Sequence, residues 1–87
     1  MNAAGSDFKQ RVVLVTGASR GIGAAIARAF ASQGAHVVVH YHQRSDLAEQ
    51  VAQDCRDLGG DGWALAADLT DPEQSRALMS QVGAEMG

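Results

Sequence analysis

The sequence lacks the features that mark disulfide-bonded, zinc-binding, nucleic-acid-binding and membrane-spanning proteins. It contains one cysteine, Cys55, so no internal disulfide can form, and no cluster of thiols suits zinc. Ten Asp and Glu outnumber seven Lys and Arg, without the basic excess that binding to a phosphate backbone needs. No apolar run approaches a membrane span, and residues 1–10 lack the apolar core of a signal peptide. We expect no nucleic-acid partner, no membrane partner, no metal and a cytoplasmic location.

The composition predicts one folded domain. Of the 87 residues, 46% are hydrophobic and 20% are charged, which is too apolar for a disordered chain. There is no internal repeat, and the single proline, Pro72, falls at an expected helix start and not in a linker. Residues 1–10 are small and polar and predict a loosely held N-terminal tail. The domain is expected to span residues 11–87.

Two strands with a helix between them are predicted in the first half of the chain. Val12–Val15 is an apolar run without alternation, which is typical of a strand buried on both faces. A helix follows and ends at Gly34, and valine-rich His36–Tyr41 is the second strand. The spacing of three and four predicts an inward helical stripe made of Ile22, Ala25, Ile26, Ala29 and Phe30.

The second half repeats this alternation. Asp46 and Glu49 are spaced as a capping box, and the helix that they begin is expected to end at Gly59-Gly60. A third strand is predicted from Trp63 to Ala67. Segment 70–73 then combines a cap, an N-terminal proline and a Glu at the third helical position, which predicts the start of a last helix. The expected inward residues of these two helices are Leu47, Val51, Cys55, Leu58, Leu78, Met79, Val82 and Met86. Cys55 is thus interpreted as a core residue and not a nucleophile, and Trp63 as a packing residue.

Strands and helices that alternate at this length indicate an α/β fold. The strands must be parallel and joined by right-handed crossovers, with helices on both faces of the sheet. The predicted order is βαβαβα, the N-terminal half of a doubly wound parallel sheet.

A glycine-rich turn, residues 16–23, joins the first strand to the first helix with the spacing GxxxGxG. In such a turn Gly17 permits a tight exit from the strand, Gly21 lets a pyrophosphate approach the backbone, and Gly23 lets the helix pack closely. Free N–H groups at the helix start, Ile22 included, then face the phosphates. No Gly-Lys-Ser/Thr follows, so the turn is not a P-loop. The alternative is a structural turn that binds nothing.

This turn resembles the cofactor signature TGxxxGxG of the short-chain dehydrogenase/reductase family. Thr16, Gly17, Gly21 and Gly23 match its fixed positions, and the run TGASRGIG looks like the version found in 3-oxoacyl-carrier-protein reductases. The resemblance covers residues 11–87 and implies a Rossmann-like dinucleotide-binding domain. It also implies that Asp68, followed by Leu69, binds the adenine ring. A loop or helix-cap role for the aspartate is the alternative.

The second strand ends without the acidic residue that would accept from the ribose hydroxyls of NAD. Tyr41 stands at that place, flanked by His40, His42 and Arg44. A phosphate is therefore tolerated there, which favours NADP over NAD. The resemblance to NADP-using relatives implies that Ser19 and Arg20 lie near the 2′-phosphate, where a protonated His42 would assist. A solvated surface arginine is the alternative for Arg20.

Three histidines, His36, His40 and His42, share one face of the second strand. A zinc pair at His40 and His42 lacks a third ligand at a suitable spacing. We interpret these residues as polar side chains at the sheet rim beside the cofactor.

The family reduces carbonyls with a Tyr and a Lys four residues apart, and this pair is missing. Tyr41 is followed by Ser45, and the one lysine is Lys9. A cofactor site alone supplies no proton to the carbonyl oxygen. We therefore expect a fold truncated before its fourth strand and without catalysis of its own. Its first strand would be an exposed edge that favours self-association or a complementing chain.

Two functions follow. The first is the NADP(H)-binding portion of an oxidoreductase that transfers hydride between NADPH and a ketone or 3-oxoacyl substrate. The alternative is a non-catalytic nucleotide-binding or assembly module that pairs with another chain.

Overall fold

The computed structural model describes residues 11–86, with side chains as far as residue 83; the predicted tail, residues 1–10, lies outside this range. Strands and helices alternate in the predicted βαβαβα order. The elements are β1 (Val12–Val15), α1 (Gly21–Ser32), β2 (His36–Tyr41), α2 (Ser45–Asp57), β3 (Asp61–Ala66) and α3 (Pro72–Met86). The first two strands have the predicted bounds, while β3 begins two residues before Trp63 and ends at Ala66.

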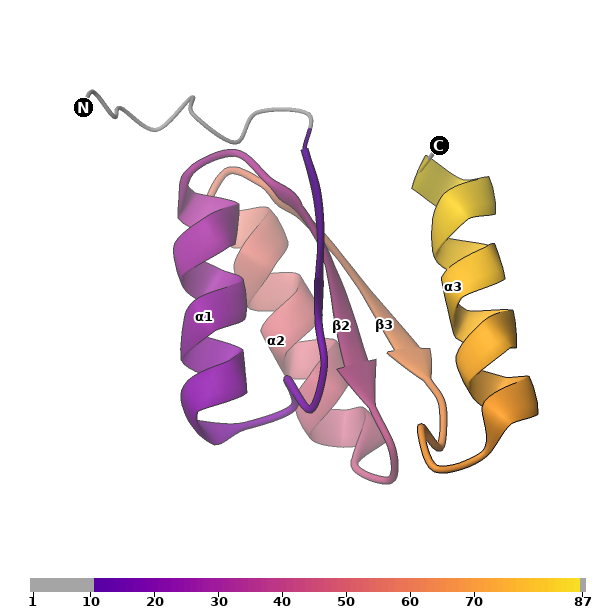
Figure 1. Cartoon of the computed structure of the whole chain (residues 1–87). Helices are drawn as coiled ribbons and strands as arrows, with labels where there is room; N and C mark the ends of the chain where they lie inside the picture. Colours follow the sequence, from indigo (N-terminus) through magenta and orange to yellow (C-terminus); the bar gives the residue numbers. More distant parts are fainter. Residues whose placement is uncertain (1–10, 87) are drawn as a thin grey trace.

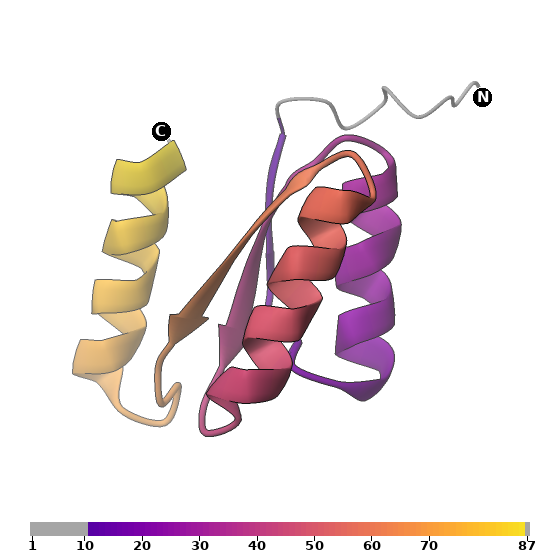
Figure 2. The same cartoon turned by 180° about the vertical axis from the view of Figure 1, so that it is seen from behind.

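The three strands form one parallel sheet in the order β1-β2-β3. Helices α1 and α2 cover one face of this sheet and α3 lies against the other, as Figures 1 and 2 show from opposite sides. Strand β2 is central, and among residues 11–86 no strand neighbours β1 on its outer side. The predicted α/β architecture, with helices on both faces, is confirmed.

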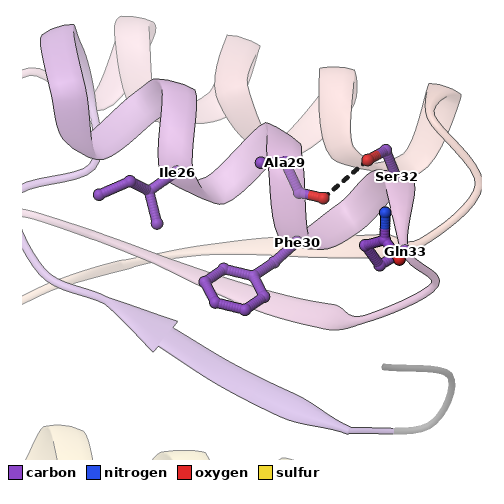
Figure 3. Close-up of a pocket in the computed structure, with 5 residues that line it drawn as sticks. All are labelled: Ile26, Ala29, Phe30, Ser32 and Gln33. Atoms are coloured by element: carbon purple, nitrogen blue, oxygen red, sulfur yellow. Dashed lines mark hydrogen bonds between the residues drawn. The ribbon is translucent and has the colours of Figure 1, made fainter. Parts of the chain in front are cut away.

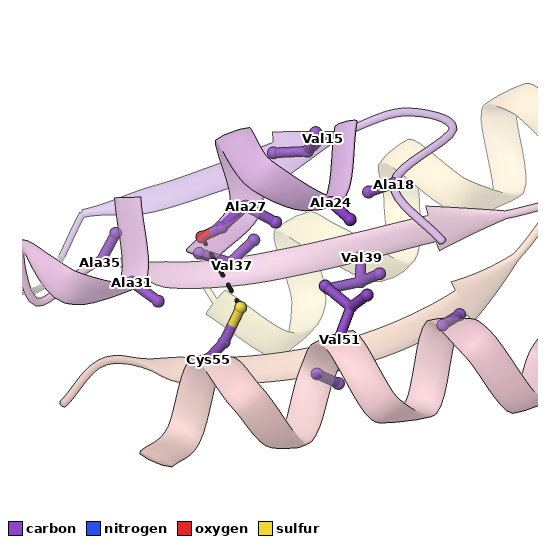
Figure 4. Close-up of a cluster of buried hydrophobic side chains, with 12 residues drawn as sticks. Val15, Ala18, Ala24, Ala27, Ala31, Ala35, Val37, Val39, Val51 and Cys55 are labelled. Carbon is purple, nitrogen blue, oxygen red and sulfur yellow. Dashed lines mark hydrogen bonds between the residues drawn. The ribbon is translucent and has the colours of Figure 1, made fainter. Parts of the chain in front are cut away.

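The core lies between the sheet and the helix pair α1 and α2 (Figure 4). Its members are mostly alanine and valine, and Cys55 is fully buried among them, as expected. These small residues let the helices approach the sheet closely: a Cβ at Gly62 on β3 would stand 2.5 Å from the carbonyl oxygen of Ala52 on α2. The buried cluster consists of Val15, Ala18, Ala24, Ala27, Ala31, Ala35, Val37, Val39, Ala48, Val51, Ala52 and Cys55.

The predicted inward stripe of α1 is wrong for its isoleucines, although Phe30, which is partly buried, does pack against the core. Ile22 and Ile26 are 80% and 42% exposed, while the buried residues of the helix are Ala24, Ala27 and Ala31. The helix contacts α2, β2 and β1, so its buried face points toward the α2 side. Only small side chains fit on the face of α1 that packs between α2 and the sheet. The larger residues Ile22 and Ile26 lie on the exposed side of the helix.

Further expectations for α2 and α3 need correction. Helix α2 begins at Ser45 with Arg44 at the N-cap, so Asp46 lies in the first turn and forms no capping box. Leu58, just after the helix, is 45% exposed, and Met79 on α3 is 58% exposed. Leu78 is buried as predicted, and the side chain of Met86 lies outside the described residues.

The start of α3 also differs from the prediction. Asp71 precedes the helix, and its Oδ1 accepts a 2.9 Å hydrogen bond from the Glu73 amide. Pro72 is then the first helical residue, where its missing N–H costs nothing, and Glu73 is the second and not the third. Within residues 11–86, no helix combines the length and the apolar character needed to cross a bilayer.

Candidate functional site

The candidate site lies along the carboxyl ends of the three strands. The turn after β1, the end of β2 and the loop after β3 meet at this one edge, at the bottom of the view in Figure 1. In open parallel sheets, ligands bind outside the carboxyl ends of the strands. The sequence-predicted residues are therefore all brought to one side of the molecule.

Three glycines shape the turn after β1. Gly17 and Gly21 have φ angles of 61° and 64°, in the left-handed region that favours glycine. A Cβ at Gly21 would meet no atom within 4 Å, so the space beside this backbone is open. At Gly23, by contrast, a Cβ would stand 2.6 Å from the Gly17 carbonyl oxygen. The helix thus packs onto the turn itself at Gly23, and the open side of Gly21 is free to admit a ligand.

The N-terminus of α1 has no internal partner for its first amides. Arg20 occupies the N-cap position with extended backbone, and its side chain makes no capping hydrogen bond. The first turn contains no acidic residue, and the first intrahelical donor is Ala24, whose amide lies 3.3 Å from the Arg20 carbonyl oxygen. An anion beside Gly21 would accept from the uncapped amides and would be stabilised by the helix dipole.

His40, near the end of β2, is buried with 5% exposure. Its Nδ1 lies 3.0 Å from the Gly17 amide nitrogen, and its Nε2 lies 2.8 Å from the Ala67 carbonyl oxygen. The expectation that this histidine is a rim residue is wrong. The one sequence signal was a polar residue inside an otherwise apolar strand, and sequence reasoning missed the bridge that it makes.

Asp68 follows β3 and caps its own loop. Its Oδ1 accepts from the Thr70 hydroxyl at 2.6 Å and from the Thr70 amide at 3.0 Å, and its own amide donates to Gln74 Oε1 at 2.8 Å. The Thr70 hydroxyl, then the Thr70 amide, and more weakly nearby His42 hold the pKa of Asp68 below its ordinary value. The carboxylate stays charged and half-exposed beside the site.

The remaining candidates differ in exposure. Tyr41 is partly buried and packs against the core, while His42 is 58% exposed with its Nε2 3.8 Å from Asp68 Oδ2. Leu69 is 43% exposed.

Arg44, which the sequence placed beside this site, forms an ion pair with Asp46 at 3.0 Å, and the hydrogen bond from this guanidinium lowers the pKa of the Asp46 carboxyl. Ser19 is half-buried, and Arg20 is exposed without an ion-pair partner among the described residues.

A pocket of about 350 Å³ lies elsewhere, against the second half of α1 (Figure 3). Ile26, Ala29, Phe30, Ser32 and Gln33 line it, and its walls are mainly apolar. Although Ile26 follows the glycine turn by only three residues, none of the predicted cofactor residues lines the pocket. This pocket is therefore separate from the candidate site. Within residues 11–86 no cluster of three His, Cys, Asp or Glu side chains could hold a metal ion.

The geometry defines a class of protein. A parallel sheet whose first strand leads through a glycine turn to an uncapped helix is the N-terminal half of a Rossmann-like nucleotide-binding fold. The family model for short chain dehydrogenases matches residues 11–87. The chain belongs to the short-chain dehydrogenase/reductase family.

Several relatives of this chain are named as reductases. Versicolorin reductase 1 of Aspergillus parasiticus is 46% identical over 77 residues, which are 88% of this chain and 29% of that protein. An NADH-dependent reductase, A1-R′, responsible for alginate metabolism, superposes on 93% of this chain and 33% of its own, with a TM-score of 0.86 and 32% identity. The angucycline C-6 ketoreductase LanV with bound NADP covers 79% of this chain and 27% of its own, with a TM-score of 0.75 and 40% identity.

These proteins are all much longer than this chain of 87 residues. The chain spans about three tenths of the length of curated relatives that it matches. The matched part contains the glycine turn and all three strands.

Proposed function

We propose that the chain is the NADP(H)-binding portion of an oxidoreductase that transfers hydride between NADPH and a ketone or 3-oxoacyl substrate. Family membership supports this proposal, as do the names of the relatives, which include a ketoreductase. The observation that carries it is the uncapped start of α1 beside the open backbone of Gly21. The TGASRGIG run resembles the 3-oxoacyl reductases, so an acyl thioester is one candidate substrate.

The residues at the strand ends fit a dinucleotide. The pyrophosphate would lie against the turn, where the amides of Gly21, Ile22 and Gly23 begin the helix. When bound, the nicotinamide supplies hydride, and this chain supplies binding and orientation. The full proposed contact set is Gly17, Ser19, Arg20, Gly21, Ile22, Gly23, Tyr41, His42, Asp68 and Leu69.

Arg20 supports the preference for NADP over NAD. Two other cationic candidates already have acidic partners, because Arg44 pairs with Asp46 and His42 lies near Asp68. Arg20, which pairs with no acidic residue within the described range 11–86, lies in the turn, where it would attract a 2′-phosphate. The family neighbours include both an NADH-dependent enzyme and one with bound NADP, so the choice depends on this chain's own charges.

Binding assays with both cofactors test this assignment. We expect the Kd for NADPH to lie about tenfold or more below that for NADH, and Arg20→Ser to remove most of the difference. Arg56→Ser is the matched control, because Arg56 is an exposed arginine at the far end of α2. Tighter binding of NADH than of NADPH by the natural sequence would refute the assignment.

The exposed edge of β1 supports a second part of the proposal. We infer that this edge pairs with a complementing segment that supplies a strand and the Tyr-x-x-x-Lys pair absent from these 87 residues. The exposed side chain of Ile26 on α1 lies on the same side (Figure 3) and would be covered with it. The length of the relatives supports a complementing segment over self-association.

Mixing experiments distinguish this function from that of a non-catalytic module. A family C-terminal half, added to this chain, is expected to restore ketone-dependent NADPH oxidation. Ile26→Asp should block that restoration, whereas Met79→Asp, at an exposed position on α3, should not. NADPH binding without any restored oxidation would favour the non-catalytic module. Sedimentation of the chain alone as a stable dimer would favour self-association.

A further inference from the structure

His40 joins the two loops on either side of its strand. It lies on central strand β2, and its ring contacts the turn after β1 through Gly17 and the loop after β3 through Ala67. These partners are 23 and 27 residues away in sequence. No other buried polar or charged side chain occurs among the described residues.

The two contacts fix the chemical form of the ring. The Gly17 amide can only donate, so Nδ1 must present its lone pair; the Ala67 carbonyl can only accept, so Nε2 must carry the hydrogen. The neutral Nε2–H tautomer alone satisfies both partners. An imidazolium would direct a second N–H at the Gly17 amide and break that contact.

The side chain extends the hydrogen bonding of the sheet past its last residues. On one side the Ala18 amide donates to the His40 carbonyl oxygen at 2.9 Å, and on the other the Ala67 amide donates to the Tyr41 carbonyl oxygen at 3.0 Å. The ring adds a further bond to each loop. Because the ring is buried and both of its nitrogens are hydrogen-bonded, this bridge holds the two loops at a fixed distance from each other.

These two loops carry the two ends of the proposed ligand site. Gly17 begins the turn that would hold the pyrophosphate, and Ala67 directly precedes Asp68, which would contact adenine. We propose that His40 is a positioning residue that sets the distance between the pyrophosphate turn and the adenine loop, and so sets dinucleotide affinity without touching the ligand. This inference rests on the proposed dinucleotide function.

Three substitutions, made in the natural full-length protein, separate the two bonds. His40→Asn places an amide oxygen near the Nδ1 position and keeps an acceptor for the Gly17 amide, while His40→Gln keeps a donor near the Nε2 position for Ala67. His40→Leu keeps bulk and removes both bonds. His36→Leu is the matched control, since His36 is at the opposite end of the same strand and stacks on Trp63 with a centroid separation of 5.9 Å.

The readout is the Kd for NADPH, together with the melting temperature of each variant. We expect His40→Leu to raise Kd by about tenfold or more, His40→Asn and His40→Gln, which each keep one of the two bonds, to lie between His40→Leu and the natural protein, and His36→Leu to leave it unchanged. Weaker binding by His40→Asn and His40→Gln at melting temperatures equal to or above that of His36→Leu supports positioning over general stability.

Failures of the two proposals look different. If the natural protein binds neither NADPH nor NADH, the proposed function is wrong and this inference is wrong with it. If the natural protein binds NADPH and all three His40 variants bind it equally well, this inference alone is overturned. If His40→Leu does not fold, the Asn and Gln variants still test the inference. It would be overturned if both variants bound NADPH as tightly as the natural protein does.

Discussion

Gly23 and Gly17 approach each other so closely that a Cβ at Gly23 would stand 2.6 Å from the Gly17 carbonyl oxygen. The neighbour is backbone, which cannot rotate away as a flexible side chain could. The contact brings the first turn of α1 down onto the exit of β1. It therefore links the position of the uncapped helix amides to the end of the strand.

Substitutions at three glycines separate crowding from conformation. Gly23→Ala should destabilise the protein by about 1–3 kcal/mol, because the new methyl forces the helix away from the turn. Gly21→Ala should cost about 1–2 kcal/mol through its left-handed φ, and it should also weaken dinucleotide binding because it fills the open side of the turn.

Gly83→Ala is the control for these two variants. Gly83 is an exposed residue in α3 with open space around its Cβ position, so the exchange should stabilise the helix by about 0.5–1 kcal/mol. Denaturant unfolding of the three variants measures all these effects. A Gly23→Ala variant as stable as the natural protein would show that the close contact is not required.

Cys55 should be inert in the folded protein. Its thiol is fully buried, and burial raises its pKa above the ordinary value, with its Sγ 3.6 Å from the Ala27 carbonyl oxygen. We expect a thiol reagent to modify it only after the molecule opens, with a rate that rises in parallel with unfolding by denaturant. Rapid labelling under native conditions would contradict the packed helix pair in Figure 4.

Asp68 should make stability depend on pH in the acid range. Its folded-state pKa is lowered, chiefly by the Thr70 hydroxyl, so it contributes stability above its unfolded pKa of about 3.9 and loses that contribution as pH falls through the folded value. The natural protein should therefore exceed Asp68→Asn in melting temperature near neutrality, and the two should converge below about pH 4. The exchange Glu49→Gln, at an exposed carboxyl on α2, is the control. A difference that stays constant across this range would mean that the charge is not involved.

The capping assignments predict unequal effects at two aspartates. Asp71 caps α3 through the Glu73 amide, so Asp71→Ala should cost about 1 kcal/mol. Asp46 lies in the first turn of α2 and not at its N-cap, and its exposed ion pair with Arg44 should make Asp46→Ala cost less. Chemical denaturation of both variants decides the matter, and equal losses would mean that Asp46 does act as a cap.

The local pattern of the sequence determined the order of elements, the bounds of β1 and β2 and the glycine turn. Valine runs and glycine punctuation act over a few residues, so they are visible along the chain. Only the tertiary structure decided which face of α1 is buried. The helix offered both an Ile stripe and an Ala stripe, and the presence of α2 on one side selected the small residues Ala24, Ala27 and Ala31.

The role of His40 depended on tertiary structure in the same way. Along the chain it was a polar residue near a strand end, indistinguishable from His36 and His42 on the same face. Its two partners come from loops on either side, and parallel pairing with β1 and β3 brings them within hydrogen-bond distance of one ring. Sequence determined the segments and their chemistry, because those depend on near neighbours. Packing decided which faces and which side chains meet, because that depends on contacts between distant residues.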